Sequence, residues 1–191
     1  MDRRKAIFSI VLGGGGVAVS FSGYKWVRMH RMPDLGFLDH HQSMIADLTE
    51  VIIPRTGTPG AKESGVGGFV IRMVKEMCDR KAQNNFIDGL KEVEAYTSSH
   101  YDKRFSDLSF AQQQQIVEHF RQKGKPYGGL AGKVEHKFLG KSFFTTLREA
   151  TIIGYCTSKA GATQELAYDF IPDTYTGCMP VTPNQKAWAT K

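Results

Sequence analysis

Residues 44–77 read MIADLTEVIIPRTGTPGAKESGVGGFVIRMVKEM, and this stretch decides the fold class. Apolar residues recur at helical spacing before Pro54 and again after Gly65. Between them, residues 55–60 contain two glycines and a proline, which interrupt both helical and strand patterns. The stretch therefore predicts two helices joined by a turn-rich loop, with the first helix ending at Pro54.

The rest of the chain indicates four further helices. Ser109 and Gln112 form a capping-box pattern at the start of one of them. No stretch alternates apolar and polar residues with the two-residue period of a strand. We therefore expect an all-α domain of about six helices with long loops, one of them the glycine-rich segment 124–132. The expected helices cover residues 39–53, 65–77, 81–97, 109–120, 142–155 and 158–167.

An irregular tail follows the last helix. Helical periodicity is lost at Asp169, and three prolines and a glycine interrupt residues 172–183. We expect residues 37–191 to form a single domain, with an extended tail over residues 169–191. A basic linker with a proline and a glycine precedes it at residues 24–36.

Residues 1–23 have the composition of an export signal. Arg3 and Arg4 precede an apolar, glycine-rich stretch, which is typical of a twin-arginine (Tat) signal. The stretch is too diluted for the roughly 20 apolar residues of a membrane span. Small residues at 18–20 allow cleavage after Ser20, and an uncleaved anchor helix is the alternative. We therefore expect a periplasmic protein exported by the Tat machinery, held at the inner membrane if the signal stays attached.

The composition is that of an ordinary globular domain. The chain has 191 residues, 41% of them apolar and 23% charged, so one domain with a real core is expected. The net charge of +6 is modest, and the basic residues are scattered among acids. This distribution argues against a nucleic-acid partner.

The chain has three cysteines, Cys78, Cys156 and Cys178, and no two of them have the C-x-x-C spacing. In an oxidising compartment Cys156 and Cys178 are the more plausible disulfide because they are closer in sequence. Three buried thiols that act as small apolar side chains are the alternative.

No catalytic or cofactor motif stands out in the sequence. The four consecutive glycines lie inside the signal segment, and no P-loop, zinc-protease, nucleophile-elbow or covalent-haem motif occurs. His40 and His41 are the only local histidine cluster, but adjacent helical residues point in different directions and chelate poorly. We therefore expect no catalytic residue and no metal ligand. An unrecognised enzyme site around these histidines and Asp169 is a minor alternative.

Three stretches together resemble the small subunit of the membrane-bound gluconate 2-dehydrogenase family, subunit 3. The most specific is residues 48–61, which contain Ile-Pro-x-Thr-x-Thr-Pro-Gly-Ala. Gly65-Val66 with Phe69 is the second match. The third runs from Phe143 to Ser158 and continues at residues 168–172.

The resemblance implies a non-catalytic partner of a flavin-dependent sugar or polyol dehydrogenase. In such complexes a large subunit of the glucose–methanol–choline type binds FAD, and a cytochrome c subunit with haem c can receive the electrons. The small subunit carries the export signal for the large one. A stand-alone exported helical binding or scaffold protein is the alternative function.

Two segments are candidates for the partner interface. An extended tail rich in aromatic residues suits a surface that wraps a partner, and the loop after Pro54 can present backbone groups. The alternatives are a tail packed on its own domain and a plain connection between helices. The candidate interface residues are Pro54, Arg55, Thr56, Thr58, Pro59, Tyr168, Ile171, Pro172, Tyr175 and Trp188.

Overall fold

Helices α3 and α4 form the helix–loop–helix unit predicted from residues 44–77. The computed structural model describes residues 31–125, 140–171, 178, 180, 181 and 183–189. In it α3 covers Gln42–Ile52 and α4 covers Val66–Met77. Gly65, just before α4, has a φ of 72°, a left-handed conformation that favours glycine.

The described part of the chain confirms the expected all-α class. It contains no strand, and its only β contact is an isolated bridge between Ala167 and Trp188. None of its helices is long and apolar enough to cross a membrane. The other elements are α2 (Gly36–His40), α5 (Arg80–Tyr101), η1 (Phe105–Asp107), α6 (Phe110–Lys123), α8 (Phe143–Cys156) and η2 (Gly161–Glu165).

The capping box predicted at Ser109 is confirmed, and α8 also begins at a capped position. Ser109 and Gln112 form the capping box that opens α6. The Ser142 hydroxyl accepts a hydrogen bond from the Thr145 N–H at the start of α8. Both helices therefore begin where the short polar side chain satisfies an otherwise free N–H group.

The predicted helix 39–53 is wrong as a single helix, because the chain breaks at His41 into α2 and α3. His41 has a φ of −107° and a ψ of 20°, outside the helical region. Its ring nitrogens lie 2.7 Å from the Phe37 carbonyl oxygen and 2.8 Å from a Glu94 oxygen of α5. The contact with Glu94 is tertiary, and a sequence pattern does not show it.

Two other boundaries differ from the prediction. Helix α5 continues beyond residue 97 to Tyr101, and it ends where Asp102 adopts a φ of 50°. The predicted helix 158–167 is instead mostly the π-helical turn η2. At its first residue, Gly161, a Cβ would lie 1.9 Å from the Tyr155 carbonyl oxygen, so the chain packs tightly against the end of α8.

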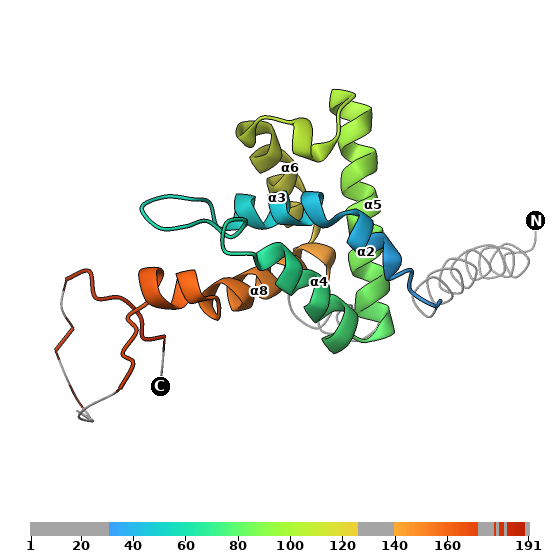
Figure 1. Cartoon of the computed structure of the whole chain (residues 1–191). Helices are drawn as coiled ribbons and strands as arrows, with labels where there is room; N and C mark the ends of the chain where they lie inside the picture. Colours follow the sequence, from blue (N-terminus) through green and yellow to red (C-terminus); the bar gives the residue numbers. More distant parts are fainter. Residues whose placement is uncertain (1–30, 126–139, 172–177, 179, 182, 190–191) are drawn as a thin grey trace, which may run out of the picture.

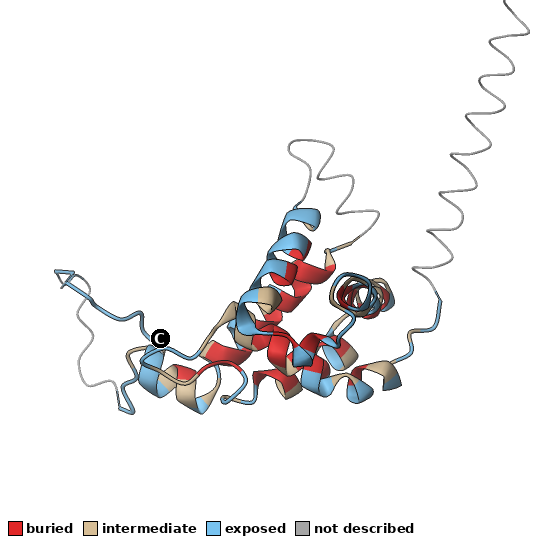
Figure 2. Cartoon of the chain, turned by 90° about the horizontal axis from the view of Figure 1, so that it is seen from above, coloured by how far each residue is buried: buried red, intermediate tan, exposed pale blue. Residues whose placement is uncertain are grey.

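Helices α3, α4, α5 and α8 enclose the core, and their buried faces meet inside the molecule (Figures 1 and 2). Two glycines allow close approach between helices. A Cβ on Gly67 of α4 would lie 3.0 Å from the Ala46 Cα of α3, and a Cβ on Gly89 of α5 would lie 2.2 Å from the Phe143 Cγ of α8. Because these crossings are tight, the helices pack with little free volume. The largest fully buried side chains include Phe86, Leu38, Ile45, Leu48, Ile87, Leu90, Ile116 and Leu147.

The described end of the predicted linker lies against α5. The Arg31 guanidinium donates hydrogen bonds to Asn84 at 3.2 Å and to Asp88 at 2.5 Å, and Asn84 donates to the Arg31 carbonyl oxygen at 2.8 Å. The signal segment 1–23, linker residues 24–30 and most of the glycine-rich loop lie outside the described residues.

Substitution of Gly89 tests the close approach of α5 and α8. Gly89→Ala gains about 1 kcal/mol of helix propensity, but its methyl group overlaps Phe143, which costs about 1–3 kcal/mol. The matched control is Gly68→Ala in α4, where a Cβ meets nothing within 4 Å. Because propensity cancels between the two variants, urea denaturation should show Gly89→Ala less stable than Gly68→Ala by about 1–3 kcal/mol. Equal stability of the two variants would contradict this packing.

Candidate partner-binding site

The proline loop, residues 54–61, is closed by one carboxylate from α3. The Arg55 N–H donates to Glu50 Oε1 at 2.9 Å, and the Lys62 N–H donates to Glu50 Oε2 at 2.8 Å. The carboxylate therefore joins two N–H groups on opposite sides of the loop. A Cβ on Gly60 would lie 2.2 Å from Glu50 Oε1, so glycine leaves the space that the carboxylate occupies.

Both ends of the proline loop are fixed to the helices. The Ala61 N–H donates to the Ile53 carbonyl oxygen at 2.9 Å, and the Lys62 ammonium contacts the buried Asp47 at 2.5 Å. At the tip, the Thr56 N–H donates to the Thr58 carbonyl oxygen at 3.2 Å. The loop is thus an ordered connection that leaves residues 55–57 exposed.

Two hydrogen bonds join the proline loop to the C-terminal end of the domain. The Tyr155 hydroxyl of α8 donates to the Pro59 carbonyl oxygen at 2.8 Å. The Thr58 hydroxyl donates to Glu165 of η2 at 2.8 Å, across 107 residues of sequence. The loop therefore lies beside the segment from which the tail leaves the domain (Figure 1).

The tail returns to its own base. The Ala167 N–H donates to the Ala187 carbonyl oxygen, and the Ala189 N–H donates to the Ala167 carbonyl oxygen, both at 2.8 Å. The Lys186 ammonium also donates to the Gln164 carbonyl oxygen. The far end of the tail therefore bonds to Ala167, just before the tail, and to Gln164 of η2.

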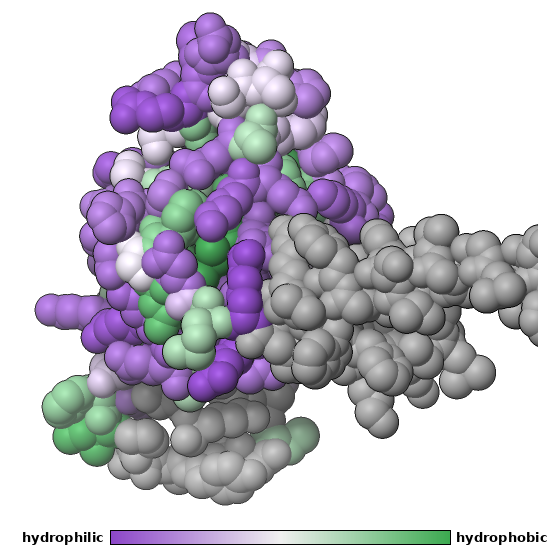
Figure 3. Space-filling view, turned by 90° about the vertical axis from the view of Figure 1, so that its right-hand side faces the viewer, coloured by the Kyte–Doolittle hydropathy of each residue, from purple (hydrophilic) through white to green (hydrophobic). Residues whose placement is uncertain are grey.

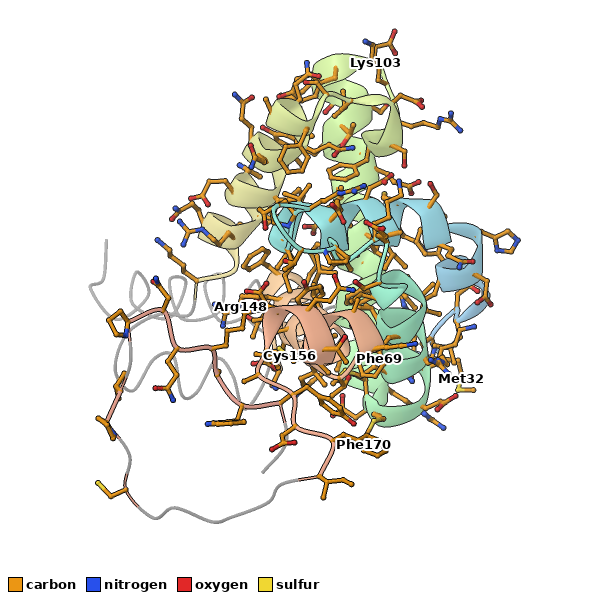
Figure 4. The ribbon with its side chains drawn as sticks, turned by 60° about the vertical axis from the view of Figure 1, so that its left-hand side comes forward. Met32, Phe69, Lys103, Arg148, Cys156 and Phe170 are labelled. Atoms are coloured by element: carbon orange, nitrogen blue, oxygen red, sulfur yellow. The ribbon has the colours of Figure 1, made fainter. Side chains whose placement is uncertain are left out.

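Apolar side chains are exposed mainly around this tail. Within the described residues, ten large hydrophobic side chains are exposed, and seven of them belong to the second half of α8 and the tail. Phe170 is 81% exposed and Ile171 is 72% exposed, and Figure 4 shows Phe170 beyond α8, away from the helical core. The seven are Ile152, Ile153, Tyr168, Phe170, Ile171, Val181 and Trp188.

Polar side chains dominate the described part of the face in Figure 3, with smaller hydrophobic areas between them. Single exposed apolar residues are normal on a protein surface, whereas a large apolar patch is typical of an interaction site, so this end of the domain is the candidate partner-binding site. The loop and tail that the sequence singled out therefore meet at the more apolar end of the domain.

The structure does not bring the histidine pair and Asp169 together. His40 and His41 end α2, whereas Asp169 lies in the tail at the other end of the domain (Figures 1 and 2). His41 is already engaged by Phe37 and Glu94, and the Asp169 carboxylate accepts from the Ile171 N–H at 3.3 Å. In the part of the chain that the structure describes, no three His, Cys, Asp or Glu side chains form a group that could hold a metal ion.

All three cysteines are free thiols in the structure, so the suggested Cys156–Cys178 disulfide is not formed there. Cys156 is half-buried at the end of α8, and Cys178 is exposed in the tail. Cys78 is half-buried after α4, and burial, with the negative charge of Asp79, raises the pKa of its thiol. A raised pKa suits a packed, unreactive thiol.

The sequence model of the gluconate 2-dehydrogenase subunit 3 family matches residues 39–172. This chain belongs to that family. Its match includes the proline loop, η2 and the first residues of the tail. Comparisons with curated proteins and with solved structures gave no significant match.

The predicted interface residues of this gluconate 2-dehydrogenase subunit 3 family member differ in exposure: Pro54, Thr58 and Pro59 are half-buried, whereas Arg55, Thr56, Tyr168, Ile171 and Trp188 are exposed. Sequence reasoning missed the residues that position the proline loop. Glu50, Tyr155 and Glu165 were not singled out, although each bonds to the proline loop. A glutamate one turn before a loop of free N–H groups was the available signal for Glu50. The predicted interface residues Pro172 and Tyr175, with the signal residues Arg3 and Arg4, lie outside the described residues.

Replacement of Glu50 tests how the proline loop is held. The Glu50→Gln side chain has one oxygen and one NH₂ group in place of the two carboxylate oxygens. Either the Arg55 or the Lys62 N–H then faces the side-chain NH₂ group and has no acceptor. We expect the free energy of unfolding to fall by about 1–3 kcal/mol. Hydrogen exchange at the Arg55 and Lys62 amides should accelerate, because these N–H groups donate to Glu50.

The matched control is Glu63→Gln. Glu63 lies 3.7 Å from the Arg55 guanidinium in an exposed ion pair, which contributes about 0–1 kcal/mol. If both variants lose the same stability and Arg55 exchange is unchanged, Glu50 does not hold the loop.

Proposed function

We propose that this chain is the non-catalytic small subunit of a periplasmic FAD-dependent sugar or polyol dehydrogenase complex. In this role it supports the export, folding and assembly of a large flavoprotein subunit of the glucose–methanol–choline type. The observation that carries the proposal is the family match over residues 39–172, since the family is described as one numbered subunit of a dehydrogenase. On this proposal FAD is bound by the large subunit, and haem c belongs to a cytochrome subunit where one is present.

The exposed apolar end of the domain supports a role in assembly. A side chain such as Phe170 gains about 1.5–3 kcal/mol when it passes from full exposure to full burial. Several such side chains in one region favour a state in which another protein covers them. The proline loop adds polar groups next to this apolar region, an arrangement typical of heteromeric interfaces.

The paired arginines supply the export part of the proposal. The Tat route carries folded proteins, so a large subunit without its own signal must bind this chain before translocation. That binding takes place in the reducing cytoplasm, where structural disulfides rarely form. The docking surface must therefore be complete without a Cys156–Cys178 bond, and the free thiols in the structure are compatible with this order of events.

Replacement of the twin arginines tests the export role. The double variant Arg3→Lys, Arg4→Lys is co-expressed with a signal-less flavoprotein large subunit of the glucose–methanol–choline type. We expect both chains to stay in the cytoplasm. The measurement is FAD-dependent dye reduction and immunoblotting in periplasmic and cytoplasmic fractions. Lys5→Arg is the matched control, because it changes a neighbouring basic residue and keeps both arginines. A large subunit that reaches the periplasm with the double variant would overturn the carrier role.

A further inference from the structure

We propose that the flavoprotein large subunit docks on one composite surface, made jointly by the proline loop and the tail. This inference rests on the proposed function and adds the location and design of the interface. The loop–tail surface consists of residues 55–57 at the tip of the proline loop and of Tyr168, Phe170, Ile171 and Trp188 in the tail.

Hydrogen bonds hold the two parts at the same end of the domain. Thr58 and Pro59 of the loop bond to Glu165 and Tyr155, which lie in η2 and near the end of α8. The tail begins directly after η2, and its far end returns to Ala167. A partner that contacts the tip of the loop therefore also reaches the apolar side chains of the tail.

The two parts offer different kinds of contact. The tip of the loop is polar and exposes the Arg55 and Thr56 side chains, whereas the tail exposes aromatic and aliphatic groups. Protein interfaces that form and persist commonly have an apolar centre with a polar rim. Large aromatic side chains such as Phe170 and Trp188 are the anchors that most often dominate binding affinity.

The surface is organised before any partner arrives. Glu50 fixes the loop through two main-chain donors, and Tyr155 and Thr58 fix its position against the end of the domain. The base of the tail is closed by two main-chain hydrogen bonds. Because these groups are already ordered, binding requires less loss of conformational freedom than docking of an unstructured segment.

The charges favour a protein occupant over a lipid surface. The described charged residues between positions 157 and 189 are Lys159, Glu165, Asp169 and Lys186, two of each sign. At the tip of the loop, Arg55 forms an ion pair with Glu63 at 3.7 Å, so this pair adds one charge of each sign. Segments that lie on anionic membranes combine their apolar face with an excess of Lys and Arg. The chain belongs to a family described as a numbered subunit of a dehydrogenase. Since such a subunit has another subunit as its partner, we favour the large subunit over a second copy of this chain as the occupant of the surface.

The first experiment measures binding of a flavoprotein large subunit of the glucose–methanol–choline type to variants of the full chain. Phe170→Ser, Ile171→Ser removes two exposed apolar groups, and we expect the affinity for the flavoprotein to fall at least tenfold. The matched control is Met77→Ser, which changes a 79% exposed methionine at the end of α4. We expect this control to bind within twofold of wild type. Thermal melting of each variant alone confirms that the fold is retained.

The second variant tests whether the loop and tail act together. Thr58→Val keeps the shape of the side chain but removes its hydrogen bond to Glu165. We expect a two- to tenfold loss of affinity for the flavoprotein, because one hydrogen bond no longer holds the loop against the base of the tail. The loss should shrink when Thr58→Val is combined with Phe170→Ser, Ile171→Ser, since a shared surface makes the effects non-additive.

The outcomes separate this inference from the proposed function. If the wild-type chain captures no flavoprotein, the proposed function fails. If it does capture the flavoprotein and the tail variant binds as well as Met77→Ser, the docking surface is elsewhere and the inference is wrong. Two other results would also overturn the inference, provided that flavoprotein binding persists in Phe170→Ser, Ile171→Ser. Loss of self-association in sedimentation would make a second copy of this chain the occupant. Loss of binding to vesicles that contain phosphatidylglycerol would make a membrane the occupant.

Discussion

The carboxylate of Glu50 is the constraint on which the exposed end of this domain depends. It accepts hydrogen bonds from the N–H groups of Arg55 and Lys62 and so fixes the path of the chain between α3 and α4. A charged acceptor strengthens both hydrogen bonds relative to neutral ones. Since the loop is held in this shape, the Pro59 carbonyl and the Thr58 hydroxyl meet their partners in α8 and η2.

The helical core supplies the frame against which this loop is set. Glycines at the crossings of α3 with α4 and of α5 with α8 let the helices approach closely. Because those contacts leave little room for adjustment, the ends of α3 and α8 stay in a defined relation to each other. A loop that bonds to both helices therefore presents its tip in one direction, which is what a specific protein interface requires.

Under the proposed function, the order of assembly and export gives this rigidity a functional reason. A protein that brings a partner through a pathway for folded proteins has to bind it before either chain reaches an oxidising compartment. Hydrogen bonds and apolar contacts form in the cytoplasm, whereas disulfides generally do not. The hydrogen bonds that support the proposed loop–tail surface are of the first kind, and Cys156 and Cys178 are free thiols in the structure.

The sequence by itself determined the helical class, most of the helix starts and the segments that contain the candidate interface. Periodicity, capping residues and prolines are local signals, and Ser109, Ser142 and Pro54 carry them without reference to the rest of the chain. The break at His41 and the turn at Gly161 were not predictable in this way, because contacts with Glu94 and with the Tyr155 carbonyl decide them.

Only the tertiary structure decided that the proline loop lies beside η2, the turn that precedes the tail. Thr58 and Glu165 are 107 residues apart, and no periodicity or motif links them. Their contact exists because the packing of α3, α4 and α8 brings two distant segments to the same end of the core. Local patterns in a chain report which segments fold, whereas long-range packing determines which of them meet.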